Sequence, residues 1–96
     1  MKPENNIWIF IGEGGRFPSS AFTEIKKAEE WMSKHQLTGM LSAMPINQGL
    51  FEWAVENDLL NIKPEKLVIK QNDPDFIGTF TTATLDHYHY KNGIKE

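Results

Sequence analysis

The first apolar segment of the chain, residues 7–11, contains only isoleucine, tryptophan and phenylalanine. A short apolar run without alternation that stops at a glycine is typical of a strand buried on both faces. Glycines between residues 12 and 15 then provide backbone that tolerates positive φ, and residues 17–22 resume an extended pattern that contains a proline. Proline within a strand is tolerated at a sheet edge. We therefore predict a central strand, an irregular hairpin tip and a short edge strand.

Two helices are predicted from apolar residues that recur at helical spacing. The first covers residues 24–35, with Thr23 as its cap and a stripe of apolar residues along one side. The second covers residues 48–58 and has a broad apolar face behind Asn47, which is a favourable cap. Residues 40–44 lie between the two helices and predict another strand, because they are mainly apolar and end at a proline.

Beyond residue 60 the pattern is less regular. Within residues 61–72 a short apolar stretch, 67–69, fits either a strand or a buried loop. Asp73 followed by proline is a good helix start, so we predict a short third helix there. Residues 87–90 alternate as a strand does, and the Asn92–Gly93 dipeptide that follows is typical of a tight turn.

This order of elements predicts an α+β domain in two layers, a small and mostly antiparallel β-sheet packed by two main helices plus a short third helix. The length of 96 residues and the apolar fraction of 40% suit one hydrophobic core. We therefore expect a single domain over residues 1–96, with residues 1–5 and 94–96 frayed.

Composition excludes several classes of function. Cysteine is absent, which removes disulfides and thiolate sites and fits a reducing compartment, so we expect a cytoplasmic protein. The apolar run near the N-terminus is too short for a signal peptide or a membrane span, so we expect no membrane insertion. A net charge of −3 and a pI near 5.6 argue against nucleic-acid binding, which needs clustered Lys and Arg.

The acidic residues are concentrated in the second half of the chain. Residues 1–48 hold five basic and five acidic residues, whereas residues 49–96 hold five basic and eight acidic ones. Two segments contain acids but no base, and Trp53 in the first of them is a candidate apolar anchor. If the segments meet in space, they form a patch for a basic protein partner; alternatively, each is an ordinary solvated surface. The acidic candidates are Glu52, Glu56, Asp58, Asp73, Asp75 and Asp86.

The glycine-rich tip offers a possible anion-binding loop at Gly14, Gly15 and Arg16, because successive backbone N–H groups beside an arginine can hold an anion. The segment lacks the ending of a P-loop and the helix of a dinucleotide fingerprint, and Glu13 adds a negative charge. We favour the simpler interpretation, a hairpin tip whose Arg16 makes a salt bridge.

His87 and His89 are spaced so that both imidazoles lie on one face of a strand and form the start of a metal site. Nothing in the spacing selects a third ligand. We favour hydrogen-bonded or solvated histidines, and we expect no cofactor, no metal and no catalytic residue. The alternative is a ligand-binding or metal-dependent enzyme built around Arg16 and this pair.

The chain resembles a family of small, mostly uncharacterised bacterial domains. The matching segments are residues 8–22 (WIFIGEGGRFPSSAF), 27–41 (KAEEWMSKHQLTGML), 45–57 (PINQGLFEWAVEN) and 76–93 (FIGTFTTATLDHYHYKNG). The resemblance implies no activity or catalytic set. It also implies that some members of the family are immunity proteins of contact-dependent growth inhibition systems, which bind and block a toxin domain such as a basic nuclease.

Two positions depart from the pattern of that family. Ser20 stands where glycine is expected, which affects the hairpin, and Asn47 stands where aspartate is expected, which removes a carboxylate. The function that we expect is therefore an immunity protein that neutralises a basic toxin domain through its acidic surface. A homo-oligomeric or regulatory module of a larger assembly is a further alternative.

Overall fold

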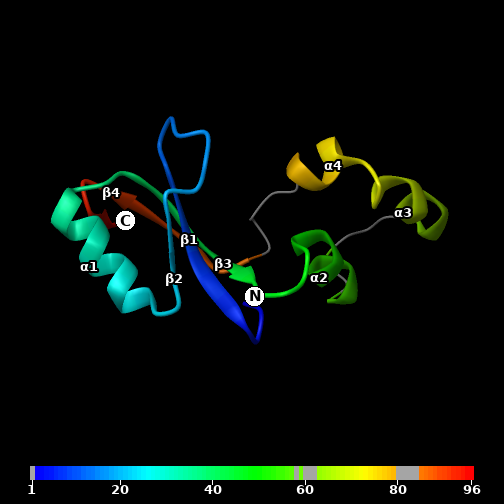
Figure 1. Cartoon of the computed structure of the whole chain (residues 1–96), viewed down its shortest axis with the longest axis horizontal. Coiled ribbons are helices and arrows are strands. Elements are labelled where there is room, and N and C mark those ends of the chain that lie inside the picture. The colour runs from blue at the N-terminus through cyan, green and yellow to red at the C-terminus, as the bar shows by residue number, and fades with distance from the viewer. Residues whose placement is uncertain (1, 58, 60–62, 80–84) are drawn as a thin grey trace.

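The chain forms a five-stranded antiparallel sheet and four helices in a computed structural model that describes residues 2–57, 59, 63–79 and 85–96 (Figure 1). The order of the strands in the sheet is β2-β1-β3-β4-β5. The predicted α+β class is confirmed. The strands are β1 (Asn6–Gly12), β2 (Ser20–Phe22), β3 (Gly39–Pro45), β4 (His87–Lys91) and β5 (Ile94–Lys95). The helices are α1 (Ile25–His35), α2 (Leu50–Glu56), α3 (Pro64–Lys70) and α4 (Pro74–Thr79).

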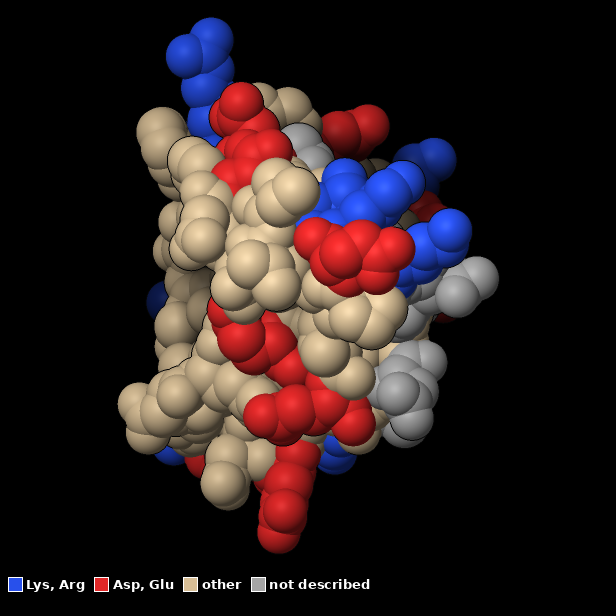
Figure 2. Space-filling model, turned by 90° about the vertical axis from the view of Figure 1, so that its right-hand side faces the viewer, with Lys and Arg blue, Asp and Glu red and all other residues tan. Residues whose placement is uncertain are grey.

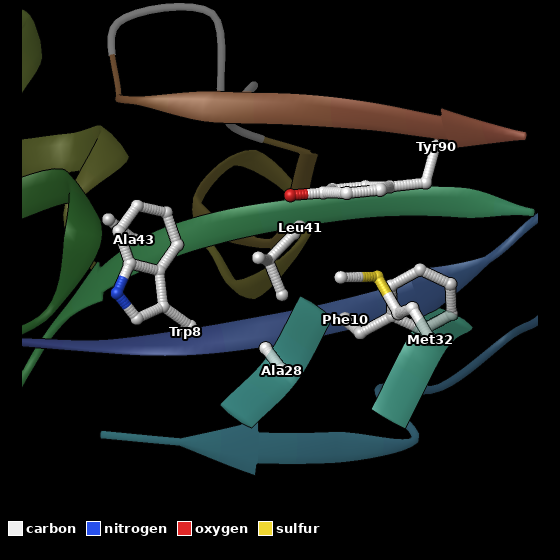
Figure 3. Close-up of a cluster of buried hydrophobic side chains, with 7 residues drawn as sticks. All are labelled: Trp8, Phe10, Ala28, Met32, Leu41, Ala43 and Tyr90. Carbon is white, nitrogen blue, oxygen red and sulfur yellow. The ribbon is translucent and has the colours of Figure 1, made fainter. Parts of the chain in front are cut away.

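Helix α1 covers one face of the sheet and forms the main core with it. Alternate residues of β1 and β3 point toward α1, because successive side chains of a strand lie on opposite faces. Phe10 and Trp31 meet edge to face, with ring centroids 5.6 Å apart. Figure 3 shows the buried side chains of this cluster, which are Trp8, Phe10, Ala28, Met32, Leu41, Ala43 and Tyr90.

The other face of β1 is only partly covered. Ile7 and Ile9 are half-buried, and Ile11 is 37% exposed. The prediction that residues 7–11 are buried on both faces is therefore wrong for Ile11. The physical reason is the position of the later helices: α2, α3 and α4 lie beyond the end of the sheet instead of across its second face (Figure 1). The molecule is accordingly elongated, with extents of 47 × 27 × 21 Å.

The turn between β4 and β5 is the predicted tight turn. Asn92 and Gly93 both have positive φ, 52° and 81°, as the hairpin geometry requires. The N–H of Gly93 donates to the carbonyl of Leu37 over 2.8 Å, so the turn is held against the end of α1. The expectation of a frayed end is wrong for residues 94–95, which pair with β4 as a short edge strand.

Helix α1 matches its predicted range but not its predicted cap. Glu24 occupies the N-cap position and makes no side-chain capping hydrogen bond, so Thr23 is not the cap. At the other end Gln36 adopts the left-handed conformation, and its N–H reaches the carbonyls of Met32 and Ser33. This closure satisfies the last turn of the helix without a glycine.

Helix α2 is shorter than predicted and begins after Gly49. Asn47 has a φ of 60° in the turn before the helix and does not cap it. Asn57 ends α2, and its side-chain amide donates to the carbonyl of Trp53 over 2.8 Å. Ser20, the other departure from the family pattern, begins β2, and its buried hydroxyl has no hydrogen-bond partner among the described residues.

Residues 67–69, predicted as a strand or a buried loop, are instead part of helix α3. Pro64 takes the first helical position, where its missing N–H costs nothing, and Val68 and Ile69 are exposed. Helix α4 begins at Pro74 as predicted, with Asp73 before it. Part of the range left open, residues 61–62, lies outside the described residues.

Candidate functional site

Glu52 and Glu56 are exposed on α2, one helical turn apart. Glu56 accepts a hydrogen bond of 2.8 Å from the side-chain amide of Gln48. The carboxylate of Glu52 lies over the backbone of Gly49, where any added Cβ would collide with it. Glu52 is in the first turn of α2, where the helix dipole favours a negative charge. Within the described chain, neither carboxylate forms an ion pair.

Asp73 and Asp75 stand at the start of α4. One carboxylate oxygen of Asp73 accepts the N–H of Asp75 over 3.0 Å and that of Phe76 over 3.4 Å, so Asp73 caps α4. The side chain of Asp75 is exposed. Asp73 therefore has a structural role in addition to any role in binding.

Aromatic contacts link α2 to α4 and α4 to α3. The rings of Phe51 and Phe76 meet edge to face, with centroids 5.6 Å apart. The Nζ atom of Lys70 lies 4.3 Å from the centre of the Phe76 ring. The acids of α2 and α4 therefore belong to the same end of the molecule. Figure 2 looks onto this end and shows acidic side chains in a band across it, with basic side chains gathered beside the band.

Trp53 is not available as an apolar anchor for a partner. It is only 6% exposed and packs with Ala54 and Leu85 in a second buried cluster. Met44 of the sheet packs against this cluster. This cluster joins α2 to the end of the sheet. The assignment of Trp53 to a binding surface is therefore replaced by a role in the core.

The two remaining acidic candidates are Asp58 and Asp86. Asp58 lies outside the described residues. Asp86 is half-buried beside Leu85, and its backbone carbonyl accepts the N–H of Ala43 over 3.1 Å. Asp86 therefore belongs to the junction between α2 and the sheet, and the described acids of this end are those of α2, α3 and α4.

A hollow of about 240 Å³ separates α2 from α3. Its apolar lining comes from Phe51, Val55 and Leu67, and Glu52 and Glu56 are at its α2 side. The sequence did not predict this hollow, because residues 61–72 were not assigned to a helix. The sequence feature that could have predicted α3 is Pro64 followed by Glu65, because both residues are favourable in the first turn of a helix.

Two backbone N–H groups of the glycine-rich tip are engaged within the chain, which leaves fewer donors for an anion. The N–H of Gly15 donates to the carbonyl of Gly12 over 2.8 Å, and the N–H of Glu13 donates to the carbonyl of Thr38 over 2.9 Å. Gly14 has a φ of 78° and serves the turn. Arg16 is exposed and, within the described chain, has no ion-pair partner, so the salt bridge expected at the tip is not formed.

His87 and His89 lie on one face of β4, as predicted, with ring centroids 5.5 Å apart. Nδ1 of His87 lies 2.8 Å from the carbonyl oxygen of Leu85, so one nitrogen of that ring is engaged by the backbone. Among the described residues, no three metal-ligating side chains come together. His89 instead lines an open hollow of about 660 Å³ that also includes Glu13 and Lys91.

Comparisons with known proteins give a family but no activity. The sequence model of the family described as Domain of unknown function (DUF7710) matches residues 7–96. No curated protein and no solved structure matches the chain. No helix in the described part of the chain has the length and apolar character needed to cross a membrane.

Proposed function

The chain belongs to the DUF7710 family, and from the surface of this member we propose that it is a protein-binding domain that holds a basic partner against α2. The observation that carries the proposal is the pair Glu52 and Glu56. Both are exposed, one turn apart, and without an ion pair in the described chain. Like charges at this spacing destabilise a helix by a few tenths of a kcal/mol. A basic partner bound beside them would replace this repulsion with attraction.

The apolar hollow next to these carboxylates supports the same function. Charged groups steer a partner and set its orientation, whereas apolar contacts supply most of the binding energy. Val55 and Leu67 in the hollow lie beside the two carboxylates. A partner that places an apolar side chain near Lys or Arg residues fits both features.

Within this function, we propose that the partner is a toxin domain and that the chain is its immunity protein. The support is the net charge of −3 and the acidic end of the molecule. A nuclease carries positive charge around its active site in order to bind phosphates. An acidic protein that covers this site blocks the substrate, and it acts in the cytoplasm, where the toxin acts.

The test is the affinity of the chain for the protein encoded immediately upstream, because immunity genes follow their toxins. Isothermal titration of the purified toxin domain is expected to give a Kd below about 1 μM. The E52K/E56K double variant is expected to weaken that affinity by about tenfold or more, since two attractive contacts become repulsive.

The matched control is E13K/E30K, which makes the same change in net charge at two exposed residues outside α2. It is expected to change the affinity by less than about threefold. Equal losses in the two double variants would show that net charge alone drives binding. Full affinity in E52K/E56K would remove α2 from the binding site, and no binding by the wild-type chain would end the immunity proposal.

A further inference from the structure

Helix α3 presents apolar residues to solvent. Val68 is 61% exposed and Ile69 is 73% exposed, and none of the residues of α3 is buried. A helix of this length is not stable alone in water, so most of its stability must come from packing. Leu67 lines the hollow beside α2 and Lys70 lies over the ring of Phe76, whereas the opposite side has no cover among the described residues.

The charges at the two ends of α3 are opposite. Lys63 and Lys66 are exposed near its start, and neither forms an ion pair with a described residue. Asp73 follows the end of the helix and is also exposed. One oxygen of its carboxylate caps α4, which leaves the other oxygen for a second contact. This surface is therefore complementary in charge to an antiparallel copy of itself.

We propose that a second copy of this chain packs antiparallel on α3, about a two-fold axis that passes between Val68 and Ile69. Such an axis brings the two exposed apolar pairs together. It also places the start of one helix beside the end of the other, so that Lys66 of each copy lies near Asp73 of the second copy. Each contact occurs twice, as a two-fold interface requires.

The remaining charged residues of α3 do not oppose this pairing. Lys70 is turned inward over the ring of Phe76, so it is directed away from the axis. Glu65 lies near the start of α3, and antiparallel pairing places it beside Asn72 near the end of the second copy's helix. The side-chain amide of Asn72 donates one N–H to the carbonyl of Val68 over 3.4 Å, and its second N–H is a donor for that carboxylate.

The size of this end limits the strength of the association. The end seen in Figure 2 is bounded by extents of 27 × 21 Å. Even complete coverage would therefore bury on the order of 600 Å² per copy, which is at the low end for specific interfaces. The dimer is thus weak and reversible, with a Kd on the order of 10–500 μM. Glu52 and Glu56 lie on α2, so this inference stands or falls separately from the proposed function.

Sedimentation equilibrium of the full chain tests the dimer directly. The wild-type mass is expected to rise from 11.0 kDa toward twice that value as the concentration increases to about 1 mM. The V68D/I69D variant is expected to stay monomeric over the same range. The matched control is Ile94→Asp, because Ile94 is 71% exposed on β5 at the opposite end of the molecule (Figure 1), and it should dimerise as the wild type does.

A second variant keeps the proposal falsifiable if V68D/I69D does not fold. Lys66→Glu preserves the helix-forming character of α3 and is expected to raise the dimer Kd by about fivefold or more. A wild-type mass that stays at 11.0 kDa up to about 1 mM overturns the proposal. So does a dimer that neither α3 variant weakens, or one that Ile94→Asp weakens equally.

Discussion

Gly39 has no room for a side chain. A Cβ at this position in β3 would collide with the carbonyl oxygen of Ile11 and lie 2.6 Å from Cζ of Phe10 and 2.8 Å from Cα of Gly12. Two of these three atoms are backbone of the neighbouring strand and cannot move away cheaply. We expect Gly39→Ala to lower the free energy of unfolding by about 1–3 kcal/mol or more, as measured by urea denaturation.

The control for this prediction is Gly12→Ala in the paired position on β1. A Cβ there would have its nearest contacts at 3.7 Å from Phe10 and 3.9 Å from Thr38, which are ordinary distances. The expected change is within about 0.5 kcal/mol. Equal effects of the two substitutions would contradict the close approach of β1 and β3 at Gly39.

Tyr90 links stability to pH. Burial, together with the 2.8 Å hydrogen bond that its hydroxyl donates to Glu29, raises the pKa of Tyr90 well above its usual range. In the unfolded chain Tyr90 ionises near pH 10, whereas in the folded chain it keeps its proton. The unfolded state therefore binds fewer protons above that pH, and the free energy of unfolding falls as the pH rises.

We expect this group to contribute a slope of about 1.4 kcal/mol per pH unit above pH 10. Tyr90→Phe is expected to cost about 0.5–1.5 kcal/mol at pH 7, because it removes the hydrogen bond to Glu29. Above pH 10 the variant should lose stability less steeply than the wild type. Parallel curves from pH 7 to 11 would show that Tyr90 is not held protonated by the fold.

At the level of elements, the side chain that caps α4 makes its own contribution to the free energy of unfolding. Asp73→Ala removes the acceptor for the N–H groups of Asp75 and Phe76, and it is expected to cost about 1 kcal/mol in thermal or urea unfolding. Asp75→Ala changes an exposed acid of the same helix that makes no such bond, and we expect a cost within about 0.5 kcal/mol. A larger loss from Asp75→Ala would contradict the capping role of Asp73.

The elements that the sequence predicted well are those with a clear apolar period. In α1 the apolar side chains recur on one face, and Ala28 and Met32 are indeed the buried ones. Helix α3 was not predicted because it buries no residue, so its sequence has no helical apolar stripe. Its apolar pair, Val68 and Ile69, faces solvent, which is the reverse of what a pattern-based assignment assumes.

The candidate site could be predicted in part from charge alone. The acidic surplus of residues 49–96 includes the acids that lie on α2 and at the start of α4. The sequence could not show which side chains are buried. Tryptophan is a residue type typical of binding anchors, but Trp53 fills the junction between α2 and the sheet. The contact of Phe51 with Phe76, which brings the acids to one end, depends on tertiary packing.

At the scale of the whole molecule, the uneven charge predicts a salt-dependent association rate. A basic partner approaching the acidic end is steered by long-range attraction, which salt screens. Raising NaCl from about 50 to 500 mM is expected to lower the association rate constant by about tenfold, with a smaller change in the dissociation rate constant. Stopped-flow mixing with the toxin domain measures both, and a salt-independent association rate would contradict steering.

A map of the surface that the partner covers tests the binding assignment most directly. Amide chemical shifts of the ¹⁵N-labelled chain are compared before and after addition of the unlabelled toxin domain. The expected shifts and broadening are concentrated in α2 and α3, at Glu52, Glu56 and the residues lining the hollow beside them. Shifts confined to α1 and the sheet, with the amides of α2 unchanged, would contradict the assignment of the acidic end as the binding surface.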